Sequence, residues 1–183
     1  LTDETSSIMS AYGDDGELES REFYFVPTTY DKELNEIDSL YDEGKFYDAL
    51  LESSNILTKD PNNIRAFIKR GRAYYALKQY NESVKDFNSA LRLAPDDTYA
   101  LKWLGFLEFN TISDKDSIET EIKLDKAINY FRQVIDIDSA DIYAHAEIAE
   151  IYKKQEKYEL AINEYILAIS KRNDYYLYYY KLA

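Results

Sequence analysis

Apolar residues between positions 64 and 97 recur three and four residues apart in two successive runs. The first run contains Phe67, Gly71, Tyr74 and Tyr75, and the second contains Val84, Phe87, Ala90 and Leu91. This spacing places each run on one face of an α-helix, so each run predicts an amphipathic helix. Residues 78–81 separate the runs as a turn, and Pro95 ends the second run because proline cannot continue a helix.

The same pair of helices repeats along the chain. Pro61 and Pro95 lie 34 residues apart, and so do Gly71 and Gly105. Self-similarity at this period is typical of solenoids, in which each unit buries its apolar face against its neighbours. The sequence therefore predicts an all-α solenoid of four antiparallel helix pairs plus a truncated fifth helix. The predicted repeats are 30–63, 64–97, 98–141 and 142–175, and the terminal helix is 176–183.

The third repeat is longer than the others, with its extra residues near 110–125. Ile118 and Ile122 are one helical turn apart, which indicates that the second helix of this repeat begins early, after an acidic loop. One interpretation is an insertion that the surface tolerates. The other is a contact surface specific to this protein.

The repeated pattern resembles the tetratricopeptide repeat (TPR) family. The match is best in Ile64–Asp97, which has Phe67, Gly71, Tyr74, Tyr80, Phe87, Ala90 and Pro95 in place. The glycines are expected to let the two helices of a repeat approach closely, because a side chain would hold them apart. The resemblance implies a right-handed superhelical solenoid whose first helices line a concave groove. It also implies a non-enzymatic adaptor or scaffold for protein–protein interaction.

The composition leaves little room for catalytic chemistry. The 183 residues include no cysteine and one histidine, which excludes disulfides, thiolate metal sites and a cysteine nucleophile. His145 occupies the repeat position of Phe67 and Leu101, so we expect it in or near the core. Glycine-rich phosphate-binding motifs are absent. We therefore expect no catalytic residues, no metal site and no cofactor.

The net charge limits the possible partners of the chain, and the length of its apolar runs limits its possible location. Acidic residues outnumber basic ones 35 to 22, giving a net charge of −13, which argues against nucleic acid as a partner. No apolar run approaches the roughly 20 residues that span a membrane. We expect a cytoplasmic protein that binds a protein or peptide.

The groove that the resemblance implies has a distinctive composition. Basic residues meet aromatic ones there, and arginine with aromatic anchors is typical of binding hot spots. The groove is therefore predicted to bind an acidic, aromatic peptide segment. A simpler interpretation is that neighbouring carboxylates neutralise the bases and that the aromatic residues belong to the core. The predicted groove residues are Arg65, Lys69, Arg72, Tyr75, Tyr99, Lys102, Trp103 and Phe106.

One binding mode of the family is not expected. Some members clamp the C-terminal carboxylate of chaperone peptides with lysines and asparagines. At the corresponding positions this chain has Leu34, Asp38, Lys69, Tyr99 and Trp103.

The two ends of the chain do not fit the repeat. Residues 1–29 carry a net charge of −6 and are expected to be partly disordered. Within them, Phe23–Pro27 is apolar and is expected to pack on the first repeat or to lie in the groove of its own or a neighbouring chain. At the other end, five of the residues 175–180 are tyrosines. Two alternatives therefore stay open: self-association through either end, and a targeting domain of a larger enzyme or assembly.

Overall fold

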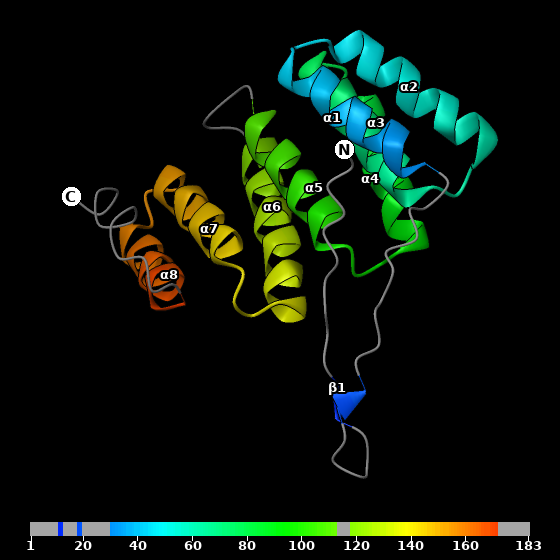
Figure 1. Ribbon diagram of the computed structural model, residues 1–183. Helices are drawn as coiled ribbons and strands as arrows, with labels where there is room; N and C mark the ends of the chain where they lie inside the picture. The colour runs from blue at the N-terminus through cyan, green and yellow to red at the C-terminus, as the bar shows by residue number, and fades with distance from the viewer. Residues whose placement is uncertain (1–10, 13–17, 20–29, 113–117, 172–183) are drawn as a thin grey trace.

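The computed structural model describes residues 11–12, 18–19, 30–112 and 118–171 of the chain. These residues contain eight helices and one short pair of strands (Figure 1). The helices are α1 (Asp31–Asp42), α2 (Phe46–Lys59), α3 (Ile64–Ala76), α4 (Tyr80–Leu93), α5 (Thr98–Asn110), α6 (Ile118–Ile137), α7 (Ile142–Lys154) and α8 (Tyr158–Ser170). Strands β1 (Ala11–Tyr12) and β2 (Leu18–Glu19) pair antiparallel, with Ala11 opposite Glu19.

The helices form four pairs that stack in a row (Figure 1). Each odd-numbered helix packs against the helix that follows it, and α2, α4 and α6 pack against the first helix of the next pair. This arrangement confirms the predicted all-α solenoid. The predicted terminal helix 176–183 lies outside the described residues, as does the N-terminal segment apart from β1 and β2.

Helices α3, α5 and α7 each begin with the same side-chain hydrogen bond to the backbone. Asn63, Asp97 and Asp141 each accept a hydrogen bond from the backbone N–H three residues later, at 2.9, 2.8 and 2.9 Å respectively. Such N-caps satisfy a backbone donor that the helix itself leaves unpaired. The three caps therefore fix the start of α3, α5 and α7 at equivalent points of successive repeats.

We predict that Asp97→Ala lowers the free energy of unfolding by about 1 kcal/mol, the usual effect of losing an N-cap. Asp96→Ala is the matched control, because Asp96 is exposed and makes no cap. Urea unfolding followed by far-ultraviolet circular dichroism measures both. Equal stability of the two variants would show that the Asp97 cap does not stabilise α5.

The centre of each middle repeat is a phenylalanine ring pressed against a glycine. Phe87 on α4 and Phe131 on α6 are fully buried. A Cβ atom placed on Gly71 would lie 3.0 Å from Phe87 Cζ, and one placed on Gly105 would lie 2.9 Å from Phe131 Cζ. Real Cβ atoms essentially never approach as closely as at Gly105, and they rarely approach as closely as at Gly71. The expectation that these glycines permit close helix packing is therefore confirmed.

The long third repeat extends its second helix. Helix α6 has 20 residues, whereas α4 has 14 and α8 has 13. Ile118 and Ile122 lie on the added turns and are 82% and 51% exposed. The early start of this helix is thus as the sequence predicted, while the predicted loop before it falls mostly on residues 113–117, outside the described part.

Candidate functional site

The first helices of the four repeats share one face of the solenoid, which we name the first-helix face (α1, α3, α5 and α7). Its centre is a cluster of aromatic rings around Trp103. The Trp103 ring stacks on Phe87 at 5.6 Å with an interplanar angle of 5°, and Tyr75 and Phe106 contact it at 5.3 and 5.6 Å. One side of Trp103 therefore belongs to the core, and the ring as a whole is half-buried.

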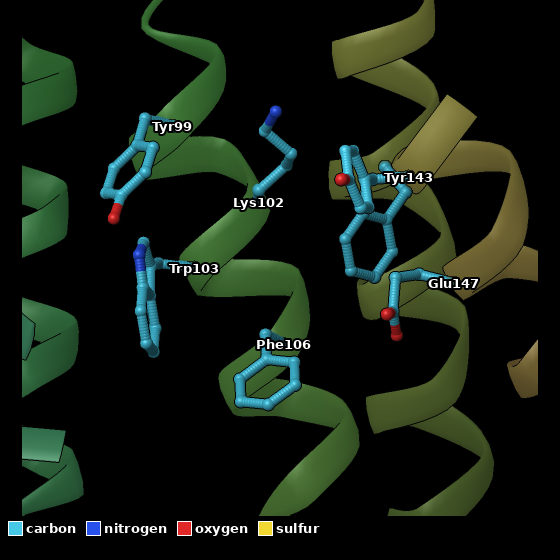
Figure 2. Close-up of a pocket in the computed structure, with 7 residues that line it drawn as sticks. Tyr99, Lys102, Trp103, Phe106, Tyr143 and Glu147 are labelled. Atoms are coloured by element: carbon cyan, nitrogen blue, oxygen red, sulfur yellow. The ribbon is translucent and has the colours of Figure 1, made fainter. Parts of the chain in front are cut away.

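A cavity of about 340 Å³ opens beside this cluster, between α5 and α7. Figure 2 shows Tyr99, Trp103 and Phe106 on α5, with Tyr143 and Glu147 facing them from α7. Tyr99 and Tyr143 are 42% and 59% exposed, so large aromatic surfaces at the cavity remain open to solvent. The cavity is lined by Tyr99, Lys102, Trp103, Phe106, Phe131, Tyr143 and Glu147.

Four basic residues of this face meet aspartates of α1 or of the turn before α7. Arg65 pairs with Asp31, and Lys69 pairs with Asp38. Arg72 Nη1 also approaches Asp38 Oδ1, at 3.5 Å, and Lys102 Nζ lies 2.7 Å from Asp141 Oδ2. These ion pairs join α1 to α3 and α5 to the start of α7. The simpler interpretation of the bases, neutralisation by nearby carboxylates, is thus part of the structure.

Arg72 has donor capacity beyond its ion pair. Its guanidinium lies over the Tyr41 ring, 4.4 Å from the centroid. Among the described residues, neither Arg72 Nε nor the Tyr41 hydroxyl has a hydrogen-bond partner, although both atoms are buried. A buried polar atom without a partner is costly, so such atoms often mark a place where another group binds.

Tyr41 and Tyr75 of this face stay uncharged at physiological pH. Burial raises the pKa of Tyr75 above its usual value, with a smaller contribution from Tyr80. Burial also raises the pKa of Tyr41, against the opposing effect of Arg72. Both rings therefore offer neutral aromatic surface and an intact hydroxyl.

The structure brings together part of the residue set predicted from the sequence. Tyr99, Lys102, Trp103 and Phe106 line the cavity, and Tyr75 reaches it through its ring contacts with Trp103 and Phe106. Arg65, Lys69 and Arg72 lie one repeat away, on α3 beside α1.

Sequence reasoning did not select Phe131, Tyr143 or Glu147 as site residues. A signal for Tyr143 existed, because it follows the N-cap Asp141 at the same distance as Tyr99 follows Asp97.

His145, the histidine that could serve catalysis or metal binding, has a structural role. His145 is 6% exposed, and its Nδ1 lies 2.7 Å from Glu164 Oε2, as expected for a core histidine. Within the described residues, no group of three His, Asp or Glu side chains is placed to hold a metal ion. Within the same ranges, no helix is long and apolar enough to cross a membrane.

Comparison with known proteins identifies the repeats. Two segments, 64–97 and 142–174, match family models described as tetratricopeptide repeat. The chain is 30% identical over 93 residues to Hsp70-Hsp90 organizing protein 3 of Arabidopsis thaliana, which covers 51% of this chain and 16% of that protein. It is 29% identical over 139 residues to a TPR repeat-containing protein of Methanocaldococcus jannaschii, which covers 68% of this chain and 24% of the relative.

Solved structures share the same architecture. A thermophilic TPR protein of Thermus thermophilus superposes with a TM-score of 0.67 at 14% identity, covering 83% of this chain and 82% of that one. The chain therefore shares the fold of a solved TPR protein. It spans between 14% and 24% of the length of the curated relatives that it matches, so its likeness to them concerns their repeats.

Proposed function

Because the chain belongs to the tetratricopeptide-repeat family, we propose that its first-helix face binds an acidic, aromatic peptide segment of a partner protein. Proteins of this family act as protein-interaction scaffolds and are typically non-enzymatic adaptors. The partner is not inferred from the Arabidopsis relative, whose name refers to two chaperones. Leu34 and Asp38 stand where a chaperone-peptide clamp has lysine and asparagine.

The observation that carries the proposal is the aromatic cavity between α5 and α7. At about 340 Å³ it has room for a large side chain, and four aromatic rings around it come from the exposed face of the solenoid. Ligand pockets are concave and lined mainly by apolar and aromatic groups, with a few polar groups that orient the ligand. Lys102 and Glu147 supply such groups at this cavity.

The charges of the same face favour carboxylates in the ligand. Four basic side chains, Arg65, Lys69, Arg72 and Lys102, pair with three aspartates, because Asp38 serves both Lys69 and Arg72. The ion-paired row is therefore net positive on a chain whose net charge is −13. A ligand carboxylate near α3 would meet the Arg72 guanidinium, which shares its acceptor Asp38 with Lys69. Charge-assisted hydrogen bonds of this kind are stronger than neutral ones.

We predict that Tyr99→Ser and Tyr143→Ser each weaken binding of an acidic, aromatic peptide about tenfold, which corresponds to about 1.4 kcal/mol. Each change removes an exposed ring at the cavity while leaving Trp103 and the core intact. Tyr47→Ser is the matched control, because Tyr47 is 70% exposed on α2 and lies outside the first-helix face. Fluorescence anisotropy with a labelled Glu-Glu-Phe-Tyr-Phe peptide measures the dissociation constants.

Two peptide variants separate the aromatic and the charged contributions. Replacing the glutamates by glutamine should weaken binding and reduce its dependence on salt, since screening acts on charges. Replacing the aromatic residues by alanine should abolish binding. If Tyr99→Ser and Tyr143→Ser bind the original peptide as tightly as Tyr47→Ser does, the cavity is not the site.

A further inference from the structure

We infer that the first-helix face is occupied in the free chain by its own residues 20–29, with Phe23, Tyr24 or Phe25 in the cavity between α5 and α7. The inference rests on the proposed function, because it names an occupant of the same site. It makes the N-terminal segment an internal competitor of any partner peptide.

The chemistry of the segment matches that of the site. Phe23, Tyr24 and Phe25 follow one another directly, and Glu22 precedes them. An aromatic side chain in the cavity would therefore bring the Glu22 carboxylate close to Lys102, which lines the same cavity. Residues 1–29 as a whole carry −6, opposite in sign to the basic row on α3 and α5. Complementary charges of this kind favour encounter between the two surfaces.

The segment also joins the solenoid close enough to the cavity to reach it. Asp31, the first residue of α1, pairs with Arg65, so α1 begins at the first-helix face. Packed helices lie about 8–10 Å apart, so the path from α1 past α3 and α5 to the cavity between α5 and α7 covers roughly 20–25 Å. The seven steps from Phe23 to Tyr30 span about 24 Å when extended. The aromatic residues can therefore reach the cavity without any movement of the helices.

Binding within one chain has an energetic advantage over binding a separate peptide. A short tether holds the segment near the cavity at an effective concentration in the millimolar range. A contact with a dissociation constant well below a millimolar is then occupied most of the time. A partner peptide must displace the segment, so its apparent affinity falls by the fraction of chains in which the site is free.

Trp103 reports on the cavity directly, because it is the only tryptophan of the chain and it lines the site. The test compares the full 183-residue chain with its Phe23→Ser, Phe25→Ser variant. We expect acrylamide to quench the Trp103 fluorescence of the variant about twice as strongly. We also expect a labelled peptide of residues 14–27 to bind the variant at least fivefold more tightly than the wild-type chain. Ile8→Ser, Met9→Ser is the matched control within the same segment and should behave as wild type.

Each outcome decides between the two proposals. If quenching and peptide affinity are the same in the variant and in wild type, the segment does not occupy the face, while binding of the peptide still supports the proposed function. If the peptide binds neither protein, the proposed function fails together with the inference. If the protection of Trp103 in wild type increases with protein concentration, a second copy supplies the segment, and occupancy within one chain is overturned.

Discussion

Replacing Gly105 by alanine will destabilise the chain by about 2 kcal/mol, although alanine is normally the better helix former. In an exposed helix the same change stabilises by up to about 1 kcal/mol, because alanine loses less backbone entropy on folding. At Gly105 the new Cβ would lie 2.9 Å from both Cε2 and Cζ of Phe131. Phe131 is buried against α5, so its ring would have to shift toward the cavity that it lines and would lose part of this packing. The steric conflict therefore outweighs the gain in helix propensity.

Two further variants isolate the cause of the Gly105→Ala effect. Phe131→Leu shortens the opposing side chain, and in this background Gly105→Ala should cost less than half as much. Gly44→Ala provides the contrast, because Gly44 has no atom near its Cβ position but has a φ of +73°, where only backbone strain acts. Chemical denaturation yields all the free energies. An unchanged cost of Gly105→Ala in the Phe131→Leu background would refute the steric explanation.

The helices and their pairing follow from the sequence because the information is local and repeated. Apolar residues at helical spacing predict each helix, and the glycine columns predict where the two helices of a pair touch. The N-caps could have been read in the same way, since Asn63 and Asp97 lie at the same point of successive repeats. Local patterns of this kind need no knowledge of the third dimension.

The ion pairs were predictable in principle but were not all identified. Asp31 and Arg65 lie 34 residues apart, and so do Asp38 and Arg72. In a solenoid of that period, residues one repeat apart occupy equivalent positions on adjacent helices, so opposite charges there indicate contact. Lys102 and Asp141 are 39 residues apart, and both fall within the predicted repeat 98–141, so they do not occupy equivalent positions of successive repeats. A search at the repeat spacing therefore does not find this pair.

The cavity itself could not be predicted from the repeat pattern. An aromatic residue on a first helix faces either the core or the solvent-exposed face, and helical spacing does not distinguish the two. Trp103 does both, because one side of its ring stacks on Phe87 while the ring also lines the cavity. Which rings leave space between α5 and α7 depends on side-chain packing across repeats. Only the folded arrangement contains that information.

Asp86→Ala will lower the free energy of unfolding by about 3 kcal/mol, because it breaks the Arg70–Asp86 ion pair. This is the largest effect on stability that we expect. Arg70 donates two hydrogen bonds to Asp86, from Nε and from Nη2, both 2.7 Å long. The pair links α3 to α4, and the side chains of Arg70 and Asp86 are 23% and 6% exposed. The hydrogen bonds to Asp86 raise the pKa of Arg70. Arginine is charged at neutral pH even without such a partner, so the guanidinium remains charged when Asp86 is removed. A largely buried charge would then have no carboxylate beside it.

The double variant Arg70→Met, Asp86→Leu shows whether this loss comes from the unpaired charge. Replacing both members of a buried ion pair by apolar residues of similar size is often neutral, because neither charge is then desolvated. The rings of Phe67 and Tyr74 lie near the Arg70 guanidinium, at 5.7 and 5.9 Å, and would pack against methionine in its place. We therefore expect the double variant to unfold within about 1 kcal/mol of wild type, since the two changes then compensate rather than add. A loss equal to the sum of the two single changes would mean that Arg70 and Asp86 stabilise the repeat independently of each other.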